Sequence, residues 1–222
     1  MRKYYLIAFL FCLCLSSCIN FNPNKSNYDG GEIDEETEIV NASQDDAVIE
    51  KSTHLKFKGV PIDGTLKEFV SRMKRKGFKS VGFDNGTAVL EGDFAAYKEC
   101  TIYVSTLDNK DLVSRITVVF PDQNTWEYLH GDYVNLKKLL TEKYGAPSSV
   151  SEKFQEKYID DDNDRMFAVK LDKCKYESRF TTEKGEIVLW IEHESVMSCF
   201  VALAYKDKIN SGIIKKIAKD DL

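Results

Sequence analysis

The residues best suited to calcium chemistry form an acidic run from Asp160 to Asp164, because calcium prefers oxygen ligands. An EF-hand loop that begins at Asp160 needs Gly at its sixth position and Glu at its twelfth, where this chain has Arg165 and Leu171. That motif is therefore excluded. We interpret the run as the solvated tip of a hairpin, with a looser oxygen-ligand site as the alternative.

The histidines and cysteines give no recognisable metal site either. None of His54, His130 and His193 has the spacing that places two ligands on one helix face. A zinc site would require His193 to meet Cys174 and Cys199 from three separate strands. We interpret these three residues as core or edge positions, so no metal or other cofactor is predicted.

A catalytic pattern is also missing from the sequence. It contains no Gly-x-Ser-x-Gly elbow, phosphate-binding loop or dinucleotide-binding fingerprint. Glu192 and Glu194 share one face of a predicted strand, but no cleft is predicted around them and we interpret them as solvent-facing charges. The chain is predicted not to be an enzyme, with a hydrolase as the disfavoured alternative.

Aromatic and arginine side chains on predicted strands are the strongest candidates for binding. From residue 186 to 193 Ile and Leu alternate with other residues, so Trp190 points away from the predicted core among charged neighbours. The same alternation places Tyr103, Arg115 and Phe200 on outward faces. Because Trp, Tyr and Arg dominate interface energies, we hypothesise that these four residues form a partner-binding surface. The alternative is that a second sheet or the terminal helix buries them.

A basic cluster lies in and just after a predicted helix. It contains Lys67, Arg72, Lys74, Arg75, Lys76 and Lys79. We interpret it as the solvated face and C-terminal end of that helix, where cations suit the helix dipole. The alternative is a contact with an anionic partner or a lipid headgroup.

The helix that carries this cluster is predicted to end at Gly77 and to begin with Asp63 or Thr65 as its N-cap. Its apolar stripe has helical spacing and consists of Leu66, Phe69, Val70 and Met73. About four antiparallel strands are predicted to follow, beginning with a hairpin at Asn85-Gly86, a pair that favours a type I′ turn.

The same order is predicted again in the second half of the chain. A helix from Asp132 to Lys143 is followed by strands over 150–158, 166–182, 186–193 and 196–205, and by a short helix over 209–217. The expected fold class is α+β: tandem units of one helix packed on an antiparallel sheet of about four strands, with a short C-terminal helix. The expected units are residues 54–122 and 123–222. One continuous α+β sheet, with 54–222 as a single compact domain, is the alternative.

The N-terminus has the layout of a bacterial lipoprotein signal. Arg2 and Lys3 precede an apolar segment of about 12 residues, which is too short to span a bilayer. Two small serines then lead to Cys18. Residues 1–17 are therefore predicted to be a signal peptide that is removed, leaving Cys18 to carry lipid.

Residues 18–53 are predicted to be the lipidated cysteine and an acidic flexible tether. Residues 19–52 carry nine acids against Lys25 and Lys51, with few apolar residues, so they cannot bury enough surface to offset their ordering entropy. The predicted location is the cell envelope, lipid-anchored, with the outer membrane favoured. Because the acids begin only at Asp29, the sequence leaves the periplasmic and surface-facing orientations open.

Removal of residues 1–17 leaves 205 residues and a net charge of −7. That acidic balance argues against a nucleic-acid partner. Cys100, Cys174 and Cys199 remain in a compartment that is expected to be oxidising. One disulfide plus a free thiol and three buried reduced thiols are both compatible with the sequence.

Short motifs add a resemblance to a known group. Gly64-Thr65 opening into a helix, and Tyr144-Gly145-Ala146-Pro147 after one, are similar to motifs of small bacterial lipoproteins. With the Leu15-Ser16-Ser17-Cys18 box and the acidic tether, the chain resembles uncharacterised lipoproteins of gut Bacteroidota. The helix-then-strands order over about residues 55–205 is similar to the β-lactamase-inhibitor-protein-like fold, which includes the outer-membrane assembly lipoprotein BamE. The resemblance implies a binding module without catalysis and transfers no binding residue.

Together these features predict a cell-envelope lipoprotein that acts as a non-catalytic binding or scaffold module. Its expected partners are the membrane, through the lipid on Cys18, and a protein or glycan. The alternative is a carbohydrate-binding accessory lipoprotein, in which exposed aromatic side chains stack on sugar rings.

Overall fold

The computed structural model describes residues 53–84, 86–107, 110–155, 161–195 and 197–220. The predicted signal peptide, Cys18 and the predicted tether up to residue 52 lie outside these residues. The described residues belong to one compact unit.

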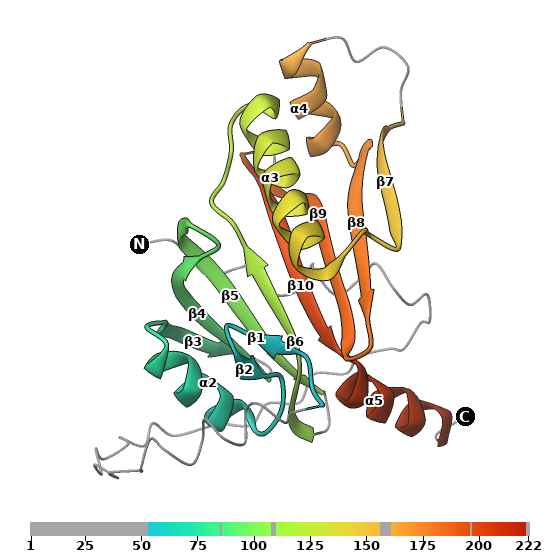
Figure 1. The fold of residues 1–222 in the computed structure, drawn as a ribbon. Coiled ribbons are helices and arrows are strands. Elements are labelled where there is room, and N and C mark those ends of the chain that lie inside the picture. Colours follow the sequence, from blue (N-terminus) through green and yellow to red (C-terminus); the bar gives the residue numbers. More distant parts are fainter. Residues whose placement is uncertain (1–52, 85, 108–109, 156–160, 196, 221–222) are drawn as a thin grey trace, which may run out of the picture. The chain divides into compact units, whose positions relative to one another are not determined.

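One antiparallel sheet of eight strands organises this unit (Figure 1). Its strands are β3 (Lys79–Asp84), β4 (Thr87–Phe94), β5 (Tyr97–Leu107), β6 (Lys110–Val119), β7 (Ser149–Phe154), β8 (Cys174–Thr182), β9 (Gly185–Ser195) and β10 (Ser198–Asp207). Their order across the sheet is β3-β4-β5-β6-β10-β9-β8-β7. The sheet therefore consists of two four-stranded meanders whose last strands, β6 and β10, lie side by side at its centre.

The predicted tandem helix-on-sheet units are wrong, because the two meanders are hydrogen-bonded to each other. Val118 on β6 is paired with Leu203 on β10, and Ile116 with Tyr205. Two separate sheets would leave the backbone N–H and C=O groups on one edge of β6 and one edge of β10 without strand partners. Their pairing satisfies these groups and merges the two halves into one continuous sheet, which is the arrangement given above as the alternative.

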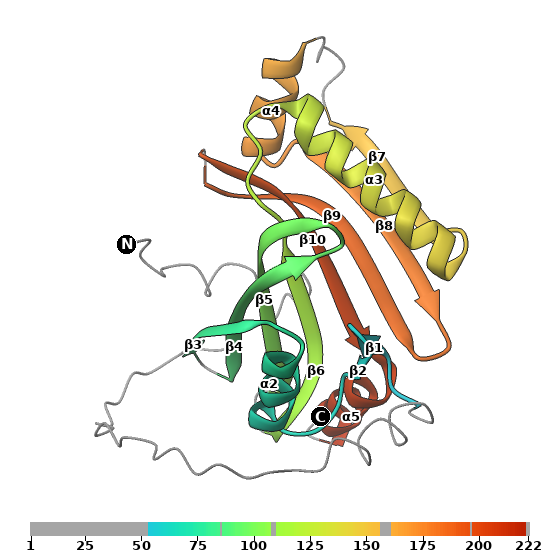
Figure 2. The same cartoon turned by 60° about the vertical axis from the view of Figure 1, so that its left-hand side comes forward.

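The described helices are α2 (Leu66–Arg75), α3 (Trp126–Tyr144), α4 (Asp162–Lys170) and α5 (Lys208–Asp220). Figures 1 and 2 show α2 and α3 on the same face of the sheet, each over its own meander. The strand pair β1 (Lys56–Phe57) and β2 (Val60–Pro61) lies on this face as well. The Phe57 ring stacks on Phe94, with centroids 5.0 Å apart, and meets Tyr205 edge-on at 5.4 Å. Phe57 therefore joins the cores of the two halves.

The first predicted helix is confirmed as α2. The hydroxyl oxygen of Thr65 accepts a hydrogen bond from the backbone N–H of Glu68, and the Glu68 carboxylate accepts one from the N–H of Thr65. This reciprocal capping satisfies two amide groups that would otherwise lack partners at the helix start. At the other end, Gly77 adopts a φ of +94°, and Phe78 donates its N–H to the carbonyl of Met73.

The second helix, α3, begins at Trp126, six residues before the predicted start at Asp132. Thr125 caps it by accepting a hydrogen bond from the N–H of Tyr128. Trp126 and Leu129 are buried in the core, so packing against the sheet stabilises turns that the prediction omitted.

The predicted hairpin tip and the strand over 166–171 are corrected, because Asp162–Lys170 forms α4. Asp161 caps this helix by accepting a hydrogen bond from the N–H of Asp164. Met166 and Val169 are buried at a spacing of three residues, whereas Phe167 is exposed, which is a helical rather than a strand pattern.

The other predicted strands and the terminal helix are present in the structure. Their ends differ from the predicted ones by a few residues, or cannot be compared because they lie outside the described residues. The segments predicted over 150–158, 186–193 and 196–205 correspond to β7, β9 and β10. Residues 156–160 and 196 lie outside the described residues. The helix predicted over 209–217 corresponds to α5.

Candidate functional site

The face of the sheet turned away from α2 and α3 is the candidate site (Figure 2). Side chains on the helix-covered face of the sheet form the main core. The residues that alternate with them along each strand point to the opposite face. Among the described elements, no helix or strand lies over that opposite face. We call it the open face and define it by these residues of the five strands β5, β6, β8, β9 and β10: Tyr103, Arg115, Thr117, Val119, Glu177, Arg179, Glu186, Val188, Trp190, Glu192, Phe200, Ala202, Ala204 and Lys206.

The centre of the open face carries small side chains. Ala202 and Ala204 lie on β10, and Ala204 is paired with Thr117 on the neighbouring strand β6. Tyr103 is paired with Thr117 from the far side, and Trp190 is paired with Ala202. With strands about 4.8 Å apart, the two aromatic residues are separated by three strand spacings, roughly 15 Å. These small side chains are buried, with Ala202 1%, Ala204 0% and Thr117 3% exposed, so the accessible parts of the open face are its half-buried side chains on either side of them.

All four residues of the predicted partner-binding surface belong to the open face. Tyr103, Arg115 and Trp190 are half-buried, so each still presents part of its side chain to solvent. Phe200 is only 3% exposed and offers little surface for a partner. Val188, Phe200 and their neighbours on this face lie outside the main core cluster.

Ion pairs occupy the end of the open face near the start of β9. Arg179 donates hydrogen bonds to Glu177 at 2.8 Å and to Glu186 at 3.1 Å, and Lys206 lies 3.4 Å from Glu186. Burial alone would raise the pKa of Glu186, but the charges of Lys206 and Arg179 outweigh it and the pKa is lowered. These charges are therefore compensated within the face itself.

Tyr103 is protonated at neutral pH, and Trp190 donates a hydrogen bond within the open face. Burial, and secondly the charge of Glu194, raises the pKa of Tyr103, so its phenol stays protonated. The indole Nε1 of Trp190 donates to Oε2 of Glu192 at 3.2 Å. This bond fixes the orientation of the indole on the open face.

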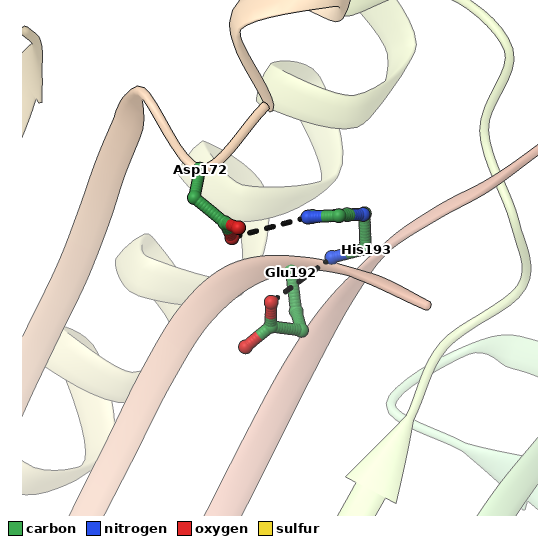
Figure 3. Close-up of side chains that lie close together, drawn as sticks. All are labelled: Asp172, Glu192 and His193. Atoms are coloured by element: carbon green, nitrogen blue, oxygen red, sulfur yellow. Dashed lines mark hydrogen bonds and ion pairs between the residues drawn. The ribbon is translucent and has the colours of Figure 1, made fainter. Parts of the chain in front are cut away.

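A second group of polar side chains lies on β9 beyond Trp190, where its pairing with β8 ends, and in the turn after α4 (Figure 3). Nε2 of His193 is 3.1 Å from Oδ1 of Asp172, and Oε1 of Glu192 accepts a hydrogen bond from the backbone N–H of His193 at 3.2 Å. Ligand atoms of the three side chains all lie within 4.8 Å of one another. The sequence interpretation did not single out Asp172, because its position depends on α4, which was not predicted.

The zinc set considered from the sequence is not brought together. Cys199 is paired with His193 across the strands, but among the described residues only Asp172, Glu192 and His193 form a group with metal-ligand spacing. Burial raises the pKa of Cys174 to about 12 and also raises that of Cys199. Both thiols are therefore protonated at neutral pH and are poor metal ligands and nucleophiles.

The acidic run considered as a calcium site has a different role where the structure describes it. Asp161 caps α4, and the Asp162 carboxylate accepts hydrogen bonds from the N–H groups of Trp126 and Glu127 at 3.0 and 2.8 Å. Asp160 lies outside the described residues. The carboxylates of Asp161 and Asp162 are thus oriented toward helix N-termini.

The predicted basic cluster lies along α2 and at its C-terminal end. Five of its members are exposed: Lys67, Lys74, Arg75, Lys76 and Lys79. Arg72 instead donates to the carbonyl oxygen of Asp63 at 2.7 Å. From a distant part of the chain, Nζ of Lys58 lies 6.0 Å from the centroid of the Phe78 ring and adds a cation near the helix end.

Comparison with protein-family models, with curated proteins and with solved structures gives no significant match to this chain. Within the part of the chain that the structure describes, no helix combines the length and apolar character needed to cross a membrane.

Proposed function

We propose that this chain is a lipid-anchored, non-catalytic binding module of the cell envelope whose open face binds a protein partner. The observation that carries the proposal is the exposed part of Tyr103, Arg115 and Trp190, which are half-buried on the sheet face that no described helix covers. The lipoprotein signal and Cys18 support the location.

The size of the sheet suits a protein partner. The five adjacent strands of the open face, spaced about 4.8 Å apart, span roughly 19 Å, and central strands of 10 to 11 residues are roughly 33 Å long. The resulting area of roughly 640 Å² is of the same order as the roughly 800 Å² that each partner contributes to a standard protein interface.

The charge of the open face also favours a protein over a polyanion. Its three cations, Arg115, Arg179 and Lys206, are matched by three carboxylates, Glu177, Glu186 and Glu192. A nucleic acid or an anionic lipid surface would need a net positive face.

Site-directed photo-crosslinking in the source cells tests this proposal. A photo-reactive residue is placed at Thr101, which is paired with Val119 of the open face, or at Tyr128, which is 65% exposed on α3. We expect one discrete crosslinked protein from position 101 and none of the same size from position 128. The adduct should be lost when Trp190→Ala or Tyr103→Ala is added. An adduct that forms equally from position 128, or that survives both substitutions, would overturn the proposal.

A glycan array distinguishes the carbohydrate-binding alternative from binding of a protein partner. Retention of a glycan by the wild-type chain, and its loss in Trp190→Ala, would show that the aromatic residues stack on sugar rings.

The membrane anchor is tested independently by labelling cells with radioactive palmitate. The label should enter the wild-type chain and be absent from Cys18→Ser.

A further inference from the structure

Asp172, Glu192 and His193 form a cluster of nitrogen and oxygen donors outside the centre of the open face. Asp172 follows the C-terminal end of α4, and Glu192 and His193 are consecutive residues of β9. Nε2 of His193 already lies 3.1 Å from Oδ1 of Asp172. Ligand atoms of all three side chains lie within 4.8 Å of one another (Figure 3).

The end of the pairing between β8 and β9 explains how two consecutive strand residues can serve one site. Side chains of neighbouring residues normally point to opposite faces of a sheet. The last pair between β8 and β9 joins Glu177 to Trp190, whereas β8 continues to Cys174 paired with β7 alone, so the pairing of β9 with β8 ends at Trp190. Both Glu192 and His193 can reach the edge of β9 beyond this point, and the turn that carries Asp172 approaches it.

The carboxylate of Glu192 is oriented before any ligand arrives. Its Oε2 accepts a hydrogen bond from the indole of Trp190, and its Oε1 accepts one from the backbone N–H of His193, both at 3.2 Å. Each oxygen keeps a further lone pair. Such outer hydrogen bonds orient metal-binding carboxylates in known sites.

We propose that Asp172, Glu192 and His193 bind one divalent transition-metal ion of the Zn²⁺ class. The imidazole nitrogen favours Zn²⁺ and its neighbours over Mg²⁺ and Ca²⁺, which prefer oxygen donors alone. The two carboxylates neutralise the charge of the ion. A fourth position stays open to water or to a group from a partner.

The movement that binding requires is small. Ligand atoms around a tetrahedral zinc ion, with bonds of about 2.0–2.1 Å, are roughly 3.4 Å apart. The donor atoms therefore close in by about 1 Å, and the Asp172 side chain, 84% exposed, is free to make most of this movement. The ion takes the place of the hydrogen bond between Asp172 and Nε2 of His193. Nδ1 of His193 is buried and has no hydrogen-bond partner among the described residues.

The site is tested with the purified mature protein in detergent, stripped with a chelator and titrated with Zn²⁺ in a calorimeter. We expect one Zn²⁺ per chain, with no displacement by millimolar Mg²⁺. Asp172→Asn should weaken the affinity at least tenfold, and His193→Gln should abolish binding. The matched control is Asp164→Asn, an equally acidic and exposed position of α4, which should bind as the wild type does.

A second readout reports where the ion is bound. Cu²⁺ quenches nearby indoles, so it should reduce the fluorescence of Trp190, which is hydrogen-bonded to Glu192. The Asp172 side chain is exposed, so Asp172→Asn leaves the core unchanged. This variant therefore measures the contribution of one metal ligand to the affinity even if His193→Gln fails to fold. Zinc absent from the wild type, or bound with equal affinity by wild type and Asp172→Asn, would overturn the proposal. This test does not depend on the identity of a protein partner.

Discussion

The carboxylate of Asp162 caps a helix to which it does not belong, by accepting hydrogen bonds from the backbone N–H of Trp126 at 3.0 Å and of Glu127 at 2.8 Å. Asp162 is the first residue of α4, whereas Trp126 is the first residue of α3. We expect Asp162→Ala to lower the free energy of unfolding by about 1–2 kcal/mol, the usual cost of losing a helix cap. Urea denaturation followed by circular dichroism measures this change.

Asp164→Ala is the control for this experiment. Asp164 is exposed in the same first turn of α4, so its removal changes the same charge near the same helix dipole. It should cost less than about 0.5 kcal/mol. Equal losses in the two variants would show that the effect of Asp162 is electrostatic and does not come from its bonds to α3.

The link between Asp162 and Trp126 also explains why α4 could not be predicted from the sequence. α2 is predicted well because Thr65 and Glu68 cap it locally and its apolar stripe has a regular period. In α4, by contrast, Asp162 bonds to residues 35 and 36 positions earlier. A run of acids without its distant donors is indistinguishable from a solvated turn.

The same distinction applies to the sheet and to the candidate sites. Alternation along a strand is local, so it could indicate that Trp190 and Phe200 point away from the core. Which strands pair at the centre of the sheet depends on residues far apart in the sequence. The pairing of Ile116 with Tyr205 cannot be inferred from the alternation of apolar and polar residues along either strand. The approach of Asp172 to His193 could not be predicted for the same reason, because α4 sets it.

A buried hydroxyl pair between α3 and β8 supports the second prediction. The Tyr133 hydroxyl lies 2.7 Å from that of Ser178 and donates to Glu152 at 3.1 Å, and both Tyr133 and Ser178 are fully buried. Tyr133→Phe leaves the Ser178 hydroxyl without this partner, which should cost about 1–3 kcal/mol. Thermal denaturation measures the loss. Tyr128→Phe is the control: that side chain is 65% exposed, and its substitution should leave the melting temperature unchanged.

The three described cysteines should be reduced thiols. Cys174 on β8 and Cys199 on β10 are separated by β9, which puts their Cα atoms about two strand spacings, roughly 10 Å, apart. A disulfide needs Cα atoms closer than about 7 Å. Burial raises the pKa of Cys100 to about 11 and that of Cys174 to about 12, so native thiols should react slowly with alkylating reagents.

Differential alkylation with peptide mapping tests this prediction without added reductant. Positions 100, 174 and 199 should be protected in the native chain and fully alkylated after denaturation. Recovery of a crosslinked peptide pair that contains Cys174 and Cys199 would contradict the strand order.

His130 should make the fold less stable in mild acid. Its ring stacks on Trp126, with centroids 5.0 Å apart, and meets Tyr176 edge-on. Burial lowers the pKa of His130 below its ordinary value of 6.5; the charge of Glu152 opposes this change and that of Arg165 adds to it.

Above pH 6.5 the ring is neutral in both the folded and the unfolded chain, so it contributes no pH dependence. As the pH falls below 6.5, the unfolded chain binds a proton that the folded chain resists. Stability is therefore lost from about pH 6.5 down through the lower folded-state pKa. His130→Phe keeps the stacking and removes the proton site, so its free energy of unfolding should fall less between pH 7 and pH 5 than that of the wild type. Urea titrations at half-unit pH steps measure both curves, and carboxylates that titrate at lower pH affect both proteins equally. Parallel curves would show that protonation of His130 does not limit stability in this range.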